Sequence, residues 1–251
     1  MFKALKISSL VIALAVTNGC AINMPNTELP KNSNYKLAST NIDTSTQRPT
    51  VIVAHGCDGT SNSSYHSWAG RIRSWGYNTI VIDSFSRRGS SDICNKPFDV
   101  MPRERAEDIL ELANFIKKQP WHKGPVGVIG FSHGASTALH IASLEEKNDV
   151  DFAIAYYPSC SFTFVGRDVT KLNIPTQVHL AEKDTWAPSV QCFFYKTNVE
   201  QYLYPNATHA FDMNFPNRVV EGHYLSYNGK ADSLARERTR EFLEKMALTK
   251  K

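Results

Sequence analysis

The clearest chemical signal in this 251-residue chain is a serine set between two glycines. Residues 130–134 read GFSHG, which fits the pattern G-x-S-x-G, and the apolar run Val126–Phe131 leads directly into them. A helix is predicted from His133 to Leu144, so Ser132 would occupy a tight turn between a strand and a helix. The unpaired N–H groups of a helix N-terminus favour negative charge that develops there. The spacing therefore predicts Ser132 as a nucleophile.

A serine hydroxyl needs an adjacent base at neutral pH, and a carboxylate commonly orients that base. In α/β hydrolases these groups follow one another along the chain in the order serine, acid, histidine. Asp184 lies in a turn shortly after the predicted strand Thr176–Leu180, where such an acid belongs. Glu182 in the same turn is the alternative acid, and an ordinary turn aspartate is the alternative interpretation of Asp184.

The expected base is His209, which lies in the loop after the last predicted strand, Glu200–Leu203. That loop returns to the edge of the sheet at which Ser132 is expected. His223 is the alternative base. In this interpretation His209 takes the proton of Ser132, while Asp184 holds the imidazole in one tautomer and stabilises its cation.

An acyl-transfer intermediate also needs preset N–H donors for its oxyanion. One donor is expected from His133, the residue after the nucleophile. The second is expected from Cys57, in the loop HGCDG (residues 55–59) that follows the short β-branched run Thr50–Ala54. An ordinary loop between strand and helix is the alternative interpretation of this segment.

The elements that must position these residues alternate between strand and helix from Pro49 onward, which favours an α/β fold whose mostly parallel sheet is covered by helices on both faces. The predicted strands are Thr50–Ala54, Thr79–Ile82, Val126–Phe131, Phe152–Tyr156, Thr176–Leu180 and Glu200–Leu203. The predicted helices are Ser63–Trp75, Pro102–Lys118, His133–Leu144, Pro188–Tyr195 and Ala231–Met246.

The N-terminal segment predicts export. Residues 1–20 combine two early lysines with a short apolar run, which is typical of a secretory signal, and Gly19-Cys20 is similar to a bacterial lipobox. Cys20 is therefore expected to be lipidated and to anchor the protein at the cell envelope; plain secretion is the alternative. Residues 21–47 are polar and are expected to form a tether, with a peripheral strand near Tyr35–Ala38, and residues 48–251 to form the folded domain.

Charge and cysteine content exclude other classes of function. The formal net charge of +4 is small and no basic block accompanies it, so no nucleic-acid partner is expected. No C-x-x-C spacing occurs, and neither a metal nor another cofactor is expected. Without Cys20, an even number of cysteines remains for disulfides, with three connectivities open: Cys57, Cys94, Cys160 and Cys192.

The chain resembles the dienelactone hydrolase family and its prolyl-oligopeptidase-like esterase relatives. The resemblance rests on residues 55–59 (HGCDG), 83–89 (DSFSRRG), Arg105-x-x-Asp108, residues 130–134, Asp184 and His209. It implies the α/β-hydrolase fold, with a mostly parallel sheet of about eight strands and helices on both faces, and the hydrolysis of esters or lactones. Members that open dienelactone use a cysteine nucleophile where this chain has Ser132, which argues against dienelactone as the substrate.

Two further expectations come from the resemblance. Arg88 matches an arginine of the family motif and is the better candidate, ahead of Arg87, for binding an acid group of the substrate; a structural ion pair is the alternative. Related exported proteins pair cysteines in the loops that contain Cys57 and Cys94, so this bond is expected, and with it the remaining pair Cys160 and Cys192.

The sequence thus predicts a serine hydrolase that cleaves carboxylic esters or lactones through an acyl-enzyme intermediate, in the periplasm or cell envelope or outside the cell. Two alternatives stay open at this point. A peptidase or an acyltransferase could use the same three residues, and a surface protein could bind ligands on this fold without catalysis.

Overall fold

The centre of the molecule is a seven-stranded sheet in the order β1-β3-β2-β4-β5-β6-β7. The computed structural model describes residues 33–194 and 198–248. Strand β1 runs antiparallel to β3, and every other neighbouring pair is parallel. The strands are β1 (Lys36–Asn41), β2 (Arg48–Ala54), β3 (Asn78–Asp83), β4 (His122–Phe131), β5 (Phe152–Tyr156), β6 (Thr176–Ala181) and β7 (Val199–Tyr204).

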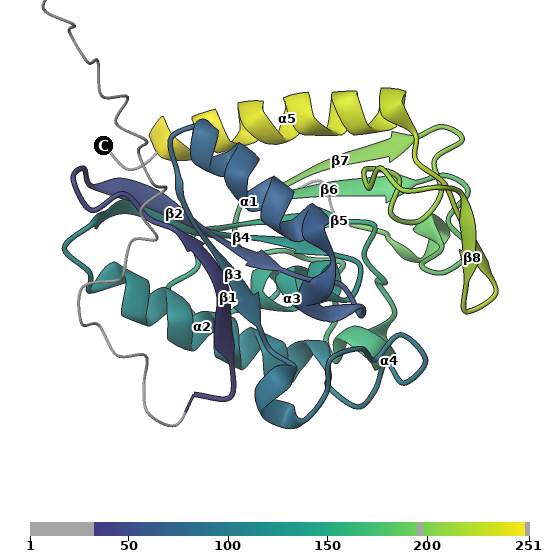
Figure 1. Ribbon diagram of the computed structural model, residues 1–251, viewed down its shortest axis with the longest axis horizontal. Helices are drawn as coiled ribbons and strands as arrows, with labels where there is room; N and C mark the ends of the chain where they lie inside the picture. The colour runs from purple at the N-terminus through teal and green to yellow at the C-terminus, as the bar shows by residue number, and fades with distance from the viewer. Residues whose placement is uncertain (1–32, 195–197, 249–251) are drawn as a thin grey trace, which may run out of the picture.

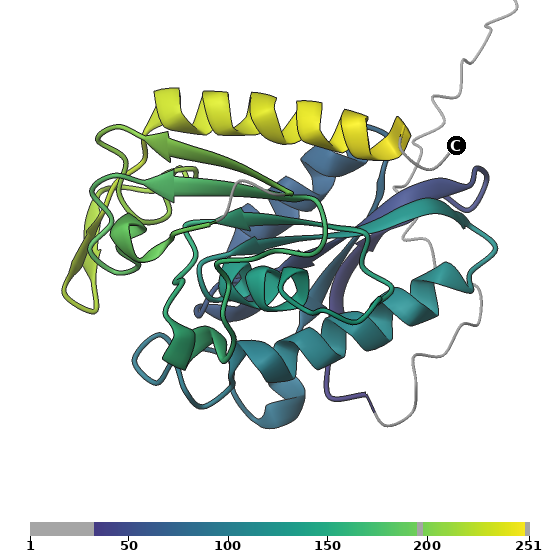
Figure 2. The same cartoon turned by 180° about the vertical axis from the view of Figure 1, so that it is seen from behind.

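Helices cover both faces of this sheet. Helices α1 (Ser63–Ser74) and α5 (Gly229–Leu248) lie on one face, and α2 (Pro102–Lys117) and α3 (His133–Ala142) lie on the other, as the two opposite views show (Figures 1 and 2). Two separate apolar clusters fill the two layers. Burial on both faces explains why the inner strands are continuous apolar runs rather than alternating ones. The predicted α/β-hydrolase fold is confirmed.

The edge of the sheet at which β6 and β7 end carries two small additions (Figure 1). One is the short helix α4 (Phe162–Val165), and the other is a hairpin of β8 (Arg218–Val220) and β9 (His223–Leu225). Parallel strands bring their carboxyl ends to one edge, and α/β folds bind ligands there. This edge therefore positions the candidate site.

The structure differs from the sequence-based expectation in three elements. The main sheet has seven strands rather than about eight, and the β8–β9 hairpin was not predicted because its strands have only three residues each. The helix predicted over Pro188–Tyr195 is wrong within its described residues. Only a single 3-10 turn, Ser189–Gln191, forms there, because the backbone is extended at Cys192, which is held in a disulfide.

The expected tether at residues 21–47 also needs correction, whereas the peripheral strand expected near Tyr35–Ala38 is present as β1. From Ser33 onward this segment belongs to the folded domain: Tyr35 is fully buried, and β1 pairs with β3 along the edge of the sheet. The backbone pairing outweighs the polar composition that suggested a tether. Residues 1–32, with the predicted signal and Cys20, lie outside the described residues. Within residues 33–194 and 198–248, no helix has the length and apolar character needed to cross a bilayer.

Candidate active site

Ser132 occupies the turn between β4 and α3 with backbone angles of φ 52° and ψ −115°, which non-glycine residues seldom adopt. The flanking glycines permit this turn because the chain is crowded around it. A Cβ atom on Gly130 would lie 2.0 Å from the carbonyl oxygen of Gly134, and one on Gly134 would lie 2.2 Å from that of Ala54. The strained backbone holds the hydroxyl of Ser132 at the carboxyl edge of the sheet.

A chain of hydrogen bonds joins Ser132 to Asp184 through His209. Ser132 Oγ lies 2.8 Å from His209 Nε2, and His209 Nδ1 lies 2.7 Å from Asp184 Oδ2. The other carboxylate oxygen, Asp184 Oδ1, accepts hydrogen bonds from the backbone N–H groups of Trp186 (2.9 Å) and Ala187 (2.8 Å). Because the carboxylate accepts, the proton of the neutral imidazole belongs on Nδ1, and Nε2 is free to take the proton of Ser132.

The alternative acid, Glu182, and the alternative base, His223, take no part in these hydrogen bonds. Glu182 is exposed and accepts a hydrogen bond from the backbone N–H of Asn206 at 2.8 Å. His223 Nδ1 lies 3.0 Å from Thr185 Oγ1, and its ring stacks on Trp186 with centroids 5.1 Å apart. The structure therefore brings together Ser132, Asp184 and His209 rather than the two alternatives.

The two loops expected to supply oxyanion donors also meet at Ser132. Cys57 follows β2, His133 is the first residue of α3, and both line a cavity that Ser132 also lines. Disulfide bonds join Cys57 to Cys94 and Cys160 to Cys192, the pairings that the resemblance favoured. The first bond ties the loop of Cys57 to the long loop after β3, and the second ties the segment before α4 to the turn after Pro188.

A buried arginine, to which the sequence analysis gave no role, links these two loops. Arg105 is fully buried; its Nη2 donates to the carbonyl oxygen of His55 at 2.7 Å, and its Nη1 donates to His133 Nδ1 at 2.9 Å. Its guanidinium carbon lies 4.9 Å from the centroid of the Phe85 ring. The side chain of Arg105 thus links the backbone of His55, two residues before Cys57, to the side chain of His133.

The charges of this pair follow from burial. Burial lowers the pKa of Arg105 to about 10, so the guanidinium remains a cation at neutral pH. Burial and the neighbouring Arg105 lower the pKa of His133 to about 3, so its imidazole is neutral. Since Nδ1 accepts from Arg105, the ring proton lies on Nε2, which is 3.3 Å from the carbonyl oxygen of Pro97. His133 is therefore held in one tautomer and is unsuited to act as a base.

The sequence carries a signal that could have found Arg105. It stands at helical spacing with Ile109, Leu112 and Ile116 on the buried stripe of α2. A charged residue on an apolar stripe must find buried partners, since an isolated buried charge is strongly unfavourable.

We expect Arg105→Met to lower kcat by roughly tenfold to a hundredfold with little change in KM. Deleting one oxyanion donor costs about 10²–10³ in rate, and this substitution would loosen the donors rather than delete them. Steady-state kinetics on a neutral ester, with circular dichroism to verify folding, measures the effect. A folded Arg105→Met protein with the parental kcat would contradict this role, and a rise in KM alone would point to substrate binding instead.

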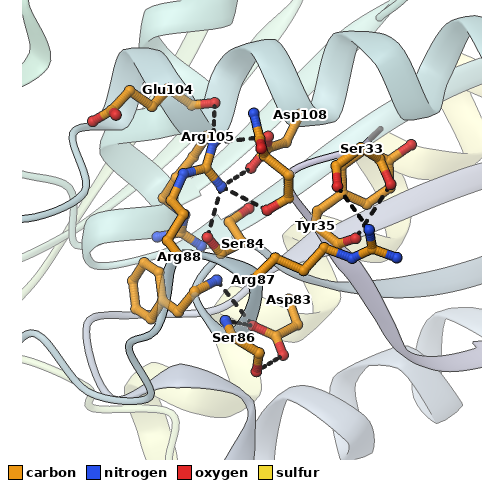
Figure 3. A network of polar contacts seen from close by, with 12 residues as sticks. Ser33, Tyr35, Asp83, Ser84, Ser86, Arg87, Arg88, Glu104, Arg105 and Asp108 are labelled. Atoms are coloured by element: carbon orange, nitrogen blue, oxygen red, sulfur yellow. Dashed lines mark hydrogen bonds and ion pairs between the residues drawn. The ribbon is translucent and has the colours of Figure 1, made fainter. Parts of the chain in front are cut away.

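The expectation that Arg88 binds substrate needs correction. Arg88 is absent from the linings of the three cavities that surround the site. Its guanidinium forms a two-pronged ion pair with Asp108 on α2, at 2.7 and 3.0 Å, and also donates to the carbonyl oxygen of Ser84 (Figure 3). It donates to the carbonyl oxygen of Asn34 as well. Arg87 likewise donates to the carbonyl oxygen of Ser33. Both arginines attach the N-terminal segment to the domain. The interpretation of Arg88 as part of a structural ion pair therefore replaces that of substrate binding.

Replacing Arg88 with methionine is expected to destabilise the fold by about 2–3 kcal/mol, because the buried carboxylate of Asp108 would lose its charged hydrogen-bond donors. Urea unfolding measures this change. The KM values of a neutral ester and of a carboxylate-bearing ester should stay in the same ratio. A selective rise in KM for the carboxylate-bearing ester would restore the substrate-binding interpretation.

Comparison with known proteins identifies the family of this chain. The profile of the dienelactone hydrolase family matches residues 38–247. The chain belongs to the dienelactone hydrolase family. It is similar to the carboxymethylenebutenolidase of Pseudomonas putida, with 23% identity over 214 residues that cover 78% of this chain and 85% of that protein.

Solved structures of other proteins superpose on this chain and share its fold. Cest-2923, a carboxylesterase from Lactobacillus plantarum WCFS1, superposes with a TM-score of 0.61 at 16% identity, covering 86% of this chain and 94% of that one. Est1E from Butyrivibrio proteoclasticus, solved with ferulic acid bound, superposes with a TM-score of 0.57 at 14% identity, covering 83% of this chain and 94% of that one. At these identities the likeness is one of fold.

Proposed function

We propose that this dienelactone hydrolase family member is a serine hydrolase that cleaves carboxylic esters or lactones through an acyl-enzyme intermediate. The observation that carries the proposal is the continuous hydrogen-bonded chain from Ser132 through His209 to Asp184, at 2.8 and 2.7 Å. The strained turn that presents Ser132 and the two loops of Cys57 and His133 supply the rest of the machinery that acyl transfer requires.

In the proposed reaction, His209 Nε2 takes the proton of Ser132 as its Oγ attacks the ester carbonyl carbon. The backbone N–H groups of Cys57 and His133 donate to the oxyanion of the tetrahedral intermediate. When the intermediate collapses, the bond to the alcohol oxygen breaks and His209 returns the proton to that oxygen. Water then repeats the sequence on the acyl-enzyme, releasing the acid and restoring Ser132. Asp184 keeps His209 oriented and stabilises its cation in each half.

We also propose that the protein works outside the cytoplasm. Two disulfide bonds, which persist in oxidising compartments, support this location. Its substrates would then be small esters met outside the cytoplasm, and the ferulic acid bound to Est1E makes esters of aryl acids reasonable members of the test panel.

The experiment that tests the function is a substrate panel with pre-steady-state kinetics. p-Nitrophenyl esters of several chain lengths, a methyl ester of an aryl acid, a lactone and a peptide p-nitroanilide are compared. We expect turnover of esters, with a burst of p-nitrophenol equal to the enzyme concentration where deacylation is slower than acylation. Cleavage of the peptide substrate without ester turnover would favour a peptidase, and binding without turnover of any member would favour a non-catalytic protein.

A further inference from the structure

The cavities at and next to Ser132 differ in the chemistry of their linings. At the centre lies a narrow cavity of about 60 Å³, which Ser132, His209, Tyr65 and Tyr157 help to line. It is too small for more than the reacting carbonyl group and its nearest atoms. The larger parts of a substrate must therefore lie in the neighbouring cavities. The residues that line those cavities indicate the chemistry of the substrate.

One neighbouring cavity, of about 290 Å³, is apolar and uncharged. Its hydrophobic lining comes from Pro97, Phe98, Phe164, Trp186 and Ala187, and its polar lining from hydroxyl groups and an amide. Its one titratable side chain, His133, is neutral because its pKa is lowered to about 3 by burial and by Arg105. A charged substituent would lose its hydration here without gaining a counter-ion.

Exposed hydrophobic side chains lie in the segments that line this cavity. Phe98 is 64% exposed and its ring packs edge-on against Phe164; Phe162 in α4 is 66% exposed and Val190 is 90% exposed. The Cys160–Cys192 bond holds the segments of Phe162 and Val190 together. Through Phe98, the apolar lining reaches the surface of the molecule, as a long or bulky hydrophobic group would require.

A second neighbouring cavity, of about 710 Å³, is mainly polar. Three asparagines and three serines line it, together with three acidic side chains and Arg218, and Phe215 and Val220 contribute a smaller apolar part. Many neutral donors and acceptors at one surface suit a ligand with many hydroxyl groups. The excess of carboxylates disfavours an anionic ligand.

The disulfide between Cys57 and Cys94 connects the three cavities. Cys94 lines all of them, and Cys57 lines the central and apolar ones. The polar cavity also shares Asp58, Asn62 and Arg218 with the central one. A single substrate can therefore extend from the polar cavity, called the polar groove below, past Ser132 and into the apolar cavity.

We propose that the substrate is an ester of an apolar acid with a polyhydroxy alcohol such as a sugar or glycerol. The inference rests on the proposed function and names its substrate class. The hydrophilic half is assigned as the alcohol because His209, which returns the proton to the leaving alcohol oxygen, lines the central cavity that adjoins the polar one and is absent from the lining of the apolar cavity. The acyl group then occupies the apolar cavity, and the alcohol leaves through the polar groove after Ser132 Oγ takes its place on the carbonyl carbon.

The test compares five esters on the full chain: 6-O-octanoylglucose, methyl octanoate, glucose 6-acetate, octyl gluconate and p-nitrophenyl acetate. We expect kcat/KM for 6-O-octanoylglucose to exceed the values for methyl octanoate and glucose 6-acetate by at least about tenfold each, because each truncated ester loses one half of the contacts. Equal values for the three would overturn the proposal. A preference for octyl gluconate would overturn the assignment of the acyl side. Turnover of p-nitrophenyl acetate alone would sink this inference and leave the proposed function standing, whereas no turnover of any ester would sink the proposed function.

A pair of variants localises the effect. Asn214→Leu places an apolar side chain in the polar groove, and Asn217→Leu makes the same change at an exposed position outside its lining. Asn214→Leu should raise KM for 6-O-octanoylglucose by about threefold to tenfold and leave methyl octanoate unchanged. Asn217→Leu should change neither. An equal effect of Asn214→Leu on both esters, or the same effect from Asn217→Leu, would contradict a polyol site in this groove.

Discussion

Replacement of Ser132 with alanine is expected to lower kcat by about 10³–10⁶ and to leave the fold intact. The hydroxyl is the group that would form the covalent bond to substrate, so no other side chain can supply the lost step. The substitution removes a single hydroxyl from a partly buried residue, and within the described residues that Oγ hydrogen-bonds only to His209, so the fold loses little. Turnover of a p-nitrophenyl ester, with circular dichroism and thermal unfolding as controls, measures both parts of the expectation.

Variants at the other positions separate the proposed roles. His209→Ala should match Ser132→Ala, and Asp184→Asn should cost about 10⁴ in kcat because His209 would lose the tautomer that leaves Nε2 free. His223→Ala is the matched control, since its ring contacts Thr185 and Trp186 rather than Ser132. It should retain activity within about tenfold. A larger loss in His223→Ala than in His209→Ala would reverse the assignment of the base.

Removal of the Cys57–Cys94 bond by the double substitution Cys57→Ser and Cys94→Ser is expected to lower kcat by about tenfold to 10³. The bond fixes the loop whose Cys57 N–H group should face the oxyanion, and losing one such donor costs about 10²–10³. The 37-residue separation also predicts a loss of roughly 3–4 kcal/mol in unfolding free energy. Kinetics below the unfolding transition, together with urea unfolding, measures the two effects separately.

The second disulfide provides the control. Cys160→Ser with Cys192→Ser loosens the segments beside the apolar cavity, where Ser159, Ser161 and Gln191 lie, and leaves the loop of Cys57 tied. It should raise KM more than it lowers kcat. If both double variants changed kcat equally, the first bond would have no special connection to the oxyanion loop, and the loss would reflect stability alone.

The candidate nucleophile could be located from sequence because its signal is local. The apolar strand, the glycine spacing and the following helix lie within about twenty residues, and the structure shows that both glycines are required by close backbone contacts. Asp184 and His209 could be chosen because the fold dictates their order along the chain, although the contact that joins them spans 25 residues. The parallel sheet was predictable because its strands are buried on both faces and read as continuous apolar runs.

Long-range polar contacts explain most of what the sequence could not show. Arg88 stands in a motif that suggested substrate binding, yet its partner is Asp108, twenty residues away on another element. Arg105 reaches His55 and His133, which are 50 and 28 residues distant. A peripheral strand was expected near Tyr35–Ala38, but its antiparallel pairing with β3, from Lys36 opposite Asp83 to Asn41 opposite Thr79, could not be read from its polar composition. Such partners are fixed by tertiary packing, and composition does not record them.

The most direct test of the central claim is intact-mass analysis of the protein after reaction with a fluorophosphonate, followed by peptide mapping. These reagents phosphonylate a serine that an adjacent base has activated: its Oγ bonds to phosphorus and fluoride leaves. The account predicts one adduct per molecule, located on Ser132, with ester hydrolysis lost in proportion to labelling, and no adduct in His209→Ala on the same timescale. Full ester turnover after stoichiometric labelling of Ser132, or a labelled residue other than Ser132 in the inactivated protein, would contradict it.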